Sequence, residues 1–257
     1  MVHISGQGRE ATLDALGFDG VHPVHQTRGR RTRDRLLHAG QRLIAGHSID
    51  TLAVADIARE AGCSVGAFYQ RFRDKNAFFR ALIAQYLSEG REATLAHYDT
   101  HNGEQLIHAL VAETADRFRR YAGLIRSAIR RRMDDSTIWD PIRDSGHFNA
   151  GRFIAWLASQ LGRALADDEE LAVRFAFQML YGTLNNAVIN QPGPLDIEDP
   201  AFVTQLEHAF RLLLDSAGVW PVPQDAALQG EVATAARNVQ RNVLAAIFKK
   251  QQVGSEN

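Results

Sequence analysis

The chain has 257 residues, of which 45% are apolar, and this is enough for one large domain or two small ones. Lys and Arg number 29 against 30 Asp and Glu, which excludes an acidic solvating tail and a uniformly basic nucleic-acid coat. The single cysteine, Cys63, excludes a disulfide framework and a multi-cysteine metal cluster. No apolar run reaches the roughly 18 residues of a membrane span, and the first 30 residues lack an apolar leader. We therefore expect a cytoplasmic protein that has no membrane partner, no metal and no cofactor.

The order of apolar residues predicts helices along most of the chain. No proline falls between residues 24 and 140, and a proline costs about 3 kcal/mol inside a helix. Apolar side chains recur at intervals of three and four, and strand-like alternation is nowhere sustained. The predicted helices lie near residues 30–47, 54–61, 65–72, 75–98, 103–120, 122–133, 138–165, 168–190 and 200–217, with a last amphipathic helix near 225–250. The fold class is therefore all-α.

One segment is strongly basic although the whole chain is nearly neutral. Residues 28–80 carry eleven basic and five acidic side chains, whereas the rest of the chain is acidic on balance. This asymmetry favours a polyanionic partner for the basic segment only, and the alternative is an ordinary solvated surface.

Residues 52–71 favour two short helices separated by a tight turn. Gly62 suits the left-handed backbone that ends many helices, because it has no Cβ to clash. Ser64 suits the N-cap of the following helix, where its oxygen accepts from an exposed backbone N–H. The segment therefore predicts a helix-turn-helix, whose second helix enters the major groove of DNA.

The same segment resembles the tetracycline-repressor (TetR) family of bacterial regulators. The matching residues are Asp56-Ile57-Ala58, Ala61-Gly62-Cys63-Ser64-Val65-Gly66-Ala67-Phe68-Tyr69, Phe72 and Lys75. The resemblance implies an N-terminal three-helix helix-turn-helix DNA-binding domain, followed by a larger helical ligand-binding and dimerisation domain. The expected parts are a flexible N-terminal extension (1–28), the DNA-binding domain (29–89, with its helix-turn-helix at about 52–71), the ligand-binding and dimerisation domain (90–218), and a C-terminal extension with an amphipathic helix (219–257).

The resemblance also implies which residues contact DNA. Tyr69 and Lys75 would bind backbone phosphates. Base reading would fall to Val65, Ala67, Gln70 and Arg71. Arginines before the first helix would form a flexible arm on phosphates or in the minor groove, unless they are only a solvated leader. The expected DNA-binding residues are Arg28, Arg30, Arg31, Arg33, Ser64, Val65, Gly66, Ala67, Tyr69, Gln70, Arg71 and Lys75.

The chain departs from the family pattern at two places. Many relatives have a Ser or Thr cap and an Arg where this chain has Ala53 and Ala55, and Thr51 is the nearest substitute for the cap. Val65 stands where Lys is frequent, which removes one possible phosphate contact. These differences place more of the expected affinity on the arginine arm.

One recognition helix reads only a few base pairs, so useful specificity requires a homodimer on a palindromic operator. The family pairs its last two core helices, which are 168–190 and 200–217 in this chain. Their apolar residues include Leu171, Phe175, Leu180, Leu184 and Ile189 in the first, and Phe202, Leu206, Phe210 and Leu213 in the second. The alternative is that these faces belong to the core of the monomer.

A small-molecule site is expected among the aromatic residues of the helical body, because an aromatic cavity with a few amides suits an apolar ligand. The candidates are Met133, Trp139, Phe153, Trp156, Phe177, Tyr181 and Asn185. Aromatic residues at helical spacing also form ordinary core, and this alternative stays open.

The function that these features favour is a sequence-specific transcriptional regulator, a repressor that a small-molecule ligand releases from its operator. A DNA-binding protein without a sensor is the alternative. An all-α enzyme is less well supported, because no acid, base and nucleophile set converges. The letters Gly62-x-Ser64-x-Gly66 also match a hydrolase nucleophile elbow, but that motif follows a β-strand, and residues 54–61 are predicted as helix.

Overall fold

The computed structural model describes residues 27–220, and all but the last of these belong to one compact unit. The predicted helix near 225–250 and almost all of the N-terminal extension lie outside the described residues. Within 27–220 every regular element is helical. The elements are α2 (Thr27–Gly46), α3 (Val54–Glu60), α4 (Val65–Tyr69), α5 (Lys75–Thr100), α6 (Gly103–Arg120), α7 (Ala122–Arg131), the 3-10 turn η1 (Ser136–Ile138), α8 (Asp140–Leu161), α9 (Asp167–Asn190) and α10 (Pro200–Ser216).

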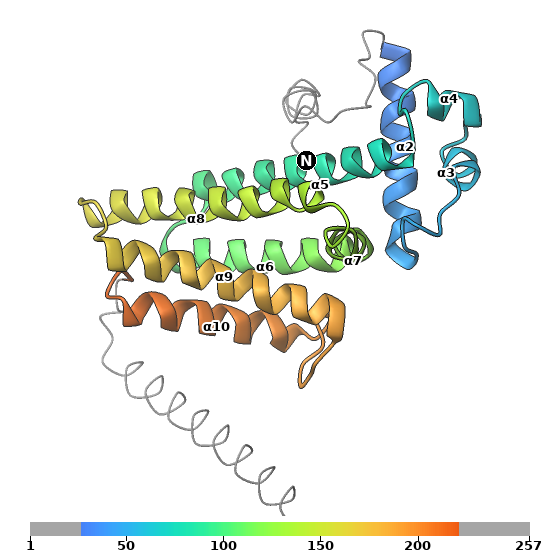
Figure 1. Ribbon diagram of the computed structural model, residues 1–257. Coiled ribbons are helices and arrows are strands. Elements are labelled where there is room, and N and C mark those ends of the chain that lie inside the picture. Colours follow the sequence, from blue (N-terminus) through green and yellow to red (C-terminus); the bar gives the residue numbers. More distant parts are fainter. Residues whose placement is uncertain (1–26, 221–257) are drawn as a thin grey trace, which may run out of the picture. The chain divides into compact units, whose positions relative to one another are not determined.

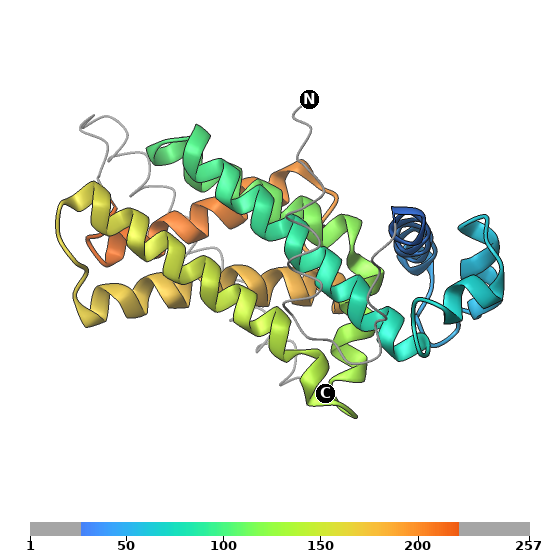
Figure 2. The same ribbon diagram turned by 90° about the horizontal axis from the view of Figure 1, so that it is seen from above.

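Helices α2, α3 and α4 form a small unit at one end, and the longer helices α5, α6, α8, α9 and α10 form the body (Figures 1 and 2). Helix α5 belongs to both, because its first turns pack on α2 and its later turns pack on α6 and α8. The expected domain boundary at residues 89 and 90 therefore falls inside one continuous helix.

Aromatic side chains form the core of the small unit. Phe68, Phe72 and Phe78 are buried, and their ring centroids lie 5.0–5.4 Å apart. Leu36 and Ile44 of α2 are buried as well. Because Phe68 and Phe78 come from α4 and α5, this cluster attaches the short recognition helix to the long helix of the body.

A second aromatic cluster lies in the body. Phe153 of α8, Phe177 of α9 and Phe210 of α10 are buried, with ring centroids 5.2–5.8 Å apart. Each helix contributes one ring, so the cluster sets the mutual positions of the three helices. It leaves Phe153 inside the core.

Helix α7 connects the body to the small unit at close range. A Cβ added to Gly123 would lie 1.7 Å from the carbonyl oxygen of Ile44, so only glycine allows α7 to approach the end of α2 this closely. The backbone N–H of Ile49 donates to Ser127 Oγ (3.3 Å). Arg131, at the end of α7, donates through Nε to Asp50 Oδ1 (3.0 Å) and through Nη1 to Asn76 Oδ1 (2.7 Å).

Candidate nucleic-acid interface and ligand cavity

The second helix of the predicted helix-turn-helix is short and well capped. Gly62 has φ of +63°, the left-handed conformation that its position in the turn requires. The Ser64 side chain accepts a hydrogen bond from the backbone N–H of Ala67 (3.1 Å) and so satisfies one free donor of the first turn of α4. Helix α3, by contrast, has Ala53 at its N-cap and no side-chain cap. Thr51 does not replace it, because no side chain accepts from the first turn of α3, and the Thr51 hydroxyl donates to the carbonyl of Ser48 (2.9 Å).

Helix α4 presents a polar and small-residue face to solvent. Phe68 is fully buried, whereas Val65 is 42% exposed and Tyr69 is 49% exposed. Ser64 and Gly66 are also exposed, and Ala67 is half-buried. The Tyr69 ring packs edge-on against Phe68 at 5.4 Å, which orients the phenol while its hydroxyl stays available.

Gln70 and Arg71 lie just beyond α4, because the helix ends at Tyr69 and not near residue 72 as predicted. Gln70 is exposed. Arg71 is half-buried, and its Nη1 donates to the carbonyl of Gln70 (3.1 Å). The Phe72 ring, which follows them, is buried in the aromatic cluster.

Lys75 begins α5, directly after the N-cap Asp74. Its Nζ donates to the carbonyl oxygens of Asp50 (2.9 Å) and Leu52 (3.1 Å). An ammonium group has three donors, so one N–H remains for a phosphate while two secure the loop between α2 and α3.

The prediction of a flexible arginine arm before the first helix is wrong. The sequence predicts that Arg28, Arg30, Arg31 and Arg33 precede the first helix, but α2 begins at Thr27 and contains all four. Arg33 is 5% exposed, with the Asp34 carboxylate 3.8 Å from its Nε, so it packs within the fold. Arg31 remains exposed. Arginine is a good helix former, so an arginine-rich segment can be part of the helix.

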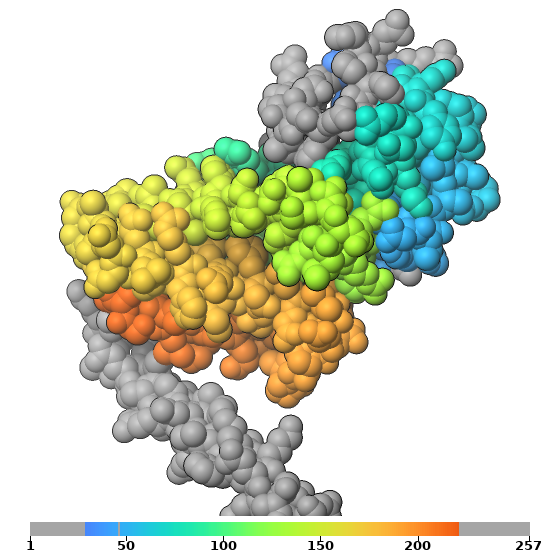
Figure 3. Space-filling view, viewed as in Figure 1, coloured from blue at the N-terminus to red at the C-terminus, as the bar shows by residue number. Residues whose placement is uncertain are grey.

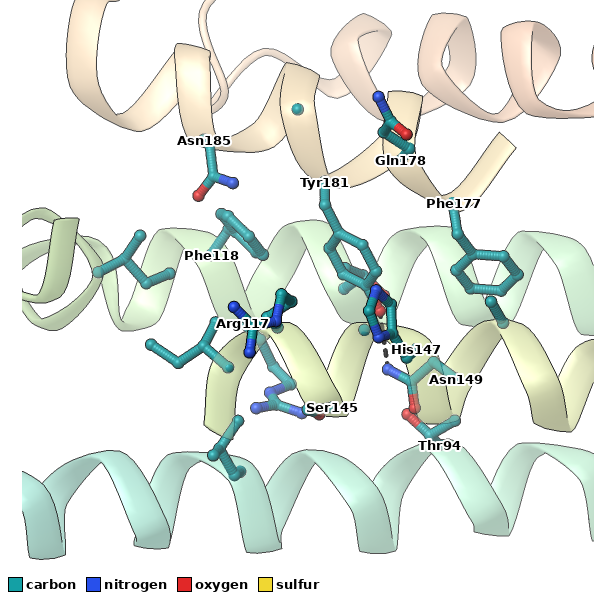
Figure 4. A pocket seen from close by; sticks show the side chains of 18 of the residues that line it. Thr94, Arg117, Phe118, Ser145, His147, Asn149, Phe177, Gln178, Tyr181 and Asn185 are labelled. Atoms are coloured by element: carbon teal, nitrogen blue, oxygen red, sulfur yellow. Dashed lines mark hydrogen bonds between the residues drawn. The ribbon is translucent and has the colours of Figure 1, made fainter. Parts of the chain in front are cut away.

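A cavity of about 690 Å³ lies in the body between α5, α6, α8 and α9 (Figure 4). Of the predicted ligand residues, Trp139, Phe177, Tyr181 and Asn185 line it. The other three do not. Phe153 is in the aromatic cluster, Trp156 packs against Phe153 with ring centroids 5.4 Å apart, and Met133 is 80% exposed on the surface.

The cavity also contains residues that the sequence did not single out, including Tyr86, Arg117, Phe118 and Asn149. Asn149 Nδ2 donates to the Tyr181 hydroxyl (2.7 Å), and burial raises the pKa of Tyr181 to about 12. The phenol is therefore neutral at pH 7. One sequence signal could have identified Arg117: it lies seven residues after Leu110 and four before Tyr121, both buried, so it falls on the same helix face.

Helix α9 is apolar on two opposite sides. Leu180 and Leu184 are buried within the monomer, whereas Leu171, Phe175, Met179 and Ile189 are exposed. The four exposed residues share one face at helical spacing, which we call the α9 stripe. Figure 3 shows the surface of α9 uncovered between α8 and α10. One face of α9 therefore belongs to the core of the monomer, and the opposite face is free for the dimer interface that the sequence predicts.

Taken together, the described residues define an all-α protein with an exposed, capped helix-turn-helix and a body that contains a cavity. Residues 36–82 match the family model of bacterial regulatory proteins, tetR family. This segment is a TetR-family N-terminal domain, and the helix-turn-helix predicted from the sequence lies inside it. No curated protein matches the chain.

The whole fold is similar to that of solved transcriptional regulators. A regulator from Rhodococcus sp. Rha1 has a TM-score of 0.58 at 18% identity, with 74% of this chain and 99% of that chain covered. A tetR-family regulator from Streptomyces coelicolor has a TM-score of 0.57 at 17% identity, with 80% and 90% covered. The fatty acid degradation regulator FadR from Bacillus halodurans has a TM-score of 0.51 at 21% identity, with 71% and 94% covered. The chain thus has the fold of a TetR-family transcriptional regulator. Within residues 27–220, no helix is long and apolar enough to cross a membrane.

Proposed function

We propose that this protein is a homodimeric transcriptional repressor that binds a palindromic operator and is released by a small molecule. The observation that carries the proposal is the joint presence, in one compact unit, of an exposed capped helix α4 and an aromatic cavity of about 690 Å³. The first feature suits a DNA groove, and the second has the size of a site for a drug-sized ligand. The similar solved structures described above are regulators.

The proposed DNA contacts come from α4 and the residues around it. Val65, Ala67 and Gln70 would meet base edges, and Tyr69 would bind a flanking phosphate. The free N–H groups at the start of α4 would add a further phosphate contact, favoured by the helix dipole. A protein with these contacts acts where chromosomal DNA is, so we expect it in the bacterial cytoplasm.

The α9 stripe supports a dimer. An exposed row of large apolar side chains on one helix usually marks an interaction site. Packing the stripe against its copy around a two-fold axis would bury the four residues of both protomers, because a two-fold interface uses the same surface on each subunit. Two recognition helices would then face one palindrome.

Helix α7 supports a connection between ligand and DNA. Ile125 of α7 lines the cavity, as does Arg132 directly after it. Residues of the same helix contact the DNA-binding unit, through Gly123 at Ile44 and through Arg131 at Asp50. A ligand that moves α7 would therefore change the position of the unit that carries α4, and only such differential binding can shift the equilibrium.

The test is to select genomic fragments bound by the purified full chain, and then to measure their release by extracts or by small molecules related to the adjacent genes. We expect a palindromic consensus and dose-dependent release. Binding without sequence preference would contradict the regulator, and specific binding that no compound affects would favour a DNA-binding protein without a sensor.

A further inference from the structure

We propose that the cavity binds an organic anion with an apolar body, and that the guanidinium of Arg117 holds its acidic group. This inference rests on the proposed function, since it names the chemical class of the small molecule. It also assigns a specific role to Arg117 of α6, labelled in Figure 4, in a cavity that residues of α5, α8 and α9 line as well.

The charge of Arg117 is not neutralised within residues 27–220. Its Nη2 donates to the carbonyl of Tyr86, and its guanidinium lies 4.3 Å from the centroid of the Tyr86 ring. Both partners are uncharged. The Nε atom is buried without a hydrogen-bond partner, and no carboxylate lies within ion-pair distance in the described part of the chain. A half-buried cation without a charged partner favours an anionic ligand.

The acidic groups near Arg117 have other partners. Asp116, directly before it, lies 2.7 Å from Arg120 Nε. Glu113, one turn earlier on α6, lies 3.4 Å from Arg120. Glu89 of α5 accepts from Gln85 Nε2 (2.9 Å) and from the Tyr121 hydroxyl. Because these carboxylates are already engaged, the guanidinium is left for a group that enters the cavity.

A glycine on the neighbouring helix makes room for this arrangement. A Cβ added to Gly90 of α5 would lie 1.1 Å from Nη1 of Arg117 and 1.9 Å from its central carbon. Gly90 stands in the middle of a 26-residue helix. At such a position glycine lowers helix stability more than every other residue except proline. The space that it provides is occupied by the guanidinium itself.

The rest of the lining selects for the body of the ligand and for its charge. Phe118, Phe177 and Tyr181 supply aromatic walls. Three further arginines line the cavity, and Glu113 is the one acidic residue in the lining. The three arginines are Arg132, Arg143 and Arg174. Arg143 and Arg174 are paired with Asp140 (2.9 Å) and Glu170 (3.2 Å), so they contribute less than Arg117.

The test compares two fluorescent probes that share one aromatic frame. The anionic probe is 8-anilinonaphthalene-1-sulfonate, and the neutral probe is N-phenyl-1-naphthylamine, which lacks the sulfonate. Titrations use the full chain, Arg117→Gln and the control Arg59→Gln, because neither Arg59 nor its ion-pair partner Asp56 lines the cavity. We expect Arg117→Gln to weaken the anionic probe about tenfold and the neutral probe less than twofold, because a charge-assisted hydrogen bond is lost. The control should change neither.

Two further variants keep the test decisive if Arg117→Gln unfolds. Arg117→Lys retains the charge without the planar fork and should give an intermediate loss. Gly90→Ala displaces the guanidinium without removing it and should weaken the anionic probe selectively. Equal loss of both probes in these variants, or a loss of the anionic probe in Arg59→Gln as large as in Arg117→Gln, would overturn the proposal.

A last comparison separates this inference from the proposed function. Decanoate and 1-decanol are tested for displacement of the anionic probe and for release of selected operator DNA. Selective displacement by decanoate without DNA release would support the anion site and count against ligand-controlled repression. DNA release by 1-decanol alone would support a sensor and overturn the anion site.

Discussion

Two glycines in helices distinguish close packing from open surface. A Cβ at Gly123 would lie 1.7 Å from the Ile44 carbonyl oxygen, whereas a Cβ at Gly151 of α8 would meet nothing within 4 Å. We expect Gly123→Ala to lower the free energy of unfolding by about 1–3 kcal/mol, since a backbone carbonyl cannot rotate away.

The matched variant is Gly151→Ala, which should raise the free energy of unfolding by up to about 1 kcal/mol through helix propensity. Urea denaturation monitored by circular dichroism measures both. Equal midpoints for the two variants would show that α7 does not approach α2 at the distance described.

Charged residues at the junction of α7 and the DNA-binding unit predict a pH dependence at the level of elements. The hydrogen bond from Arg131 is the main cause that holds the pKa of the Asp50 carboxyl below its usual value, against a smaller opposing effect of burial. The Asp50 carboxyl therefore takes up its proton at a higher pH in the unfolded chain than in the folded chain. The stabilisation is present above the usual Asp pKa of about 3.9 and is lost as the pH falls through the folded value.

We accordingly expect the melting temperature to fall as the pH drops below about 4, and to fall less steeply in Asp50→Asn. Calorimetric scans at a series of pH values provide the measurement. Parallel profiles for the two proteins would mean that the pair of Arg131 and Asp50 contributes nothing to stability.

The exposed face of α9 makes a prediction about assembly. Phe175→Glu places a charge in the α9 stripe and should halve the mass found by sedimentation. Met133→Glu is the matched control, because Met133 is also an exposed apolar residue but lies outside the stripe. A dimer that persists in Phe175→Glu, or one that Met133→Glu also dissociates, would place the interface elsewhere.

Much of this architecture follows from sequence pattern alone, and the exceptions have physical causes. The bounds of α6 coincide with the predicted 103–120, because its apolar spacing is regular and the glycine at its start is clear. The prediction of a flexible arginine arm is wrong, because charge density does not distinguish a solvated leader from a helix turn. The cavity was only partly predictable. Phe153 and Phe177 both occur at helical spacing in apolar helices, and only tertiary packing decides that Phe177 lines the cavity and Phe153 does not.

At the scale of the whole molecule, DNA affinity should depend on salt through Lys75. If its remaining N–H binds a phosphate, Lys75→Ala should weaken binding to operator and random DNA alike. The slope of log affinity against log salt should fall by about one for each protomer. Filter binding over a range of salt concentrations measures it, with Arg120→Gln as the distant control. An unchanged slope would mean that Lys75 does not contact a phosphate and only holds the loop through the Asp50 and Leu52 carbonyls.

Helix α5 places the Lys75 end and the cavity residue Tyr86 on one rigid rod. Eleven residues separate them, which is roughly 16 Å along a helix, so a tilt of about 5° around Tyr86 would displace the Lys75 end by roughly 1.4 Å. Because a two-fold dimer has two such lever arms, the spacing of its recognition helices could change by roughly twice that amount. A small rotation in the body could therefore exceed the tolerance of a phosphate hydrogen bond.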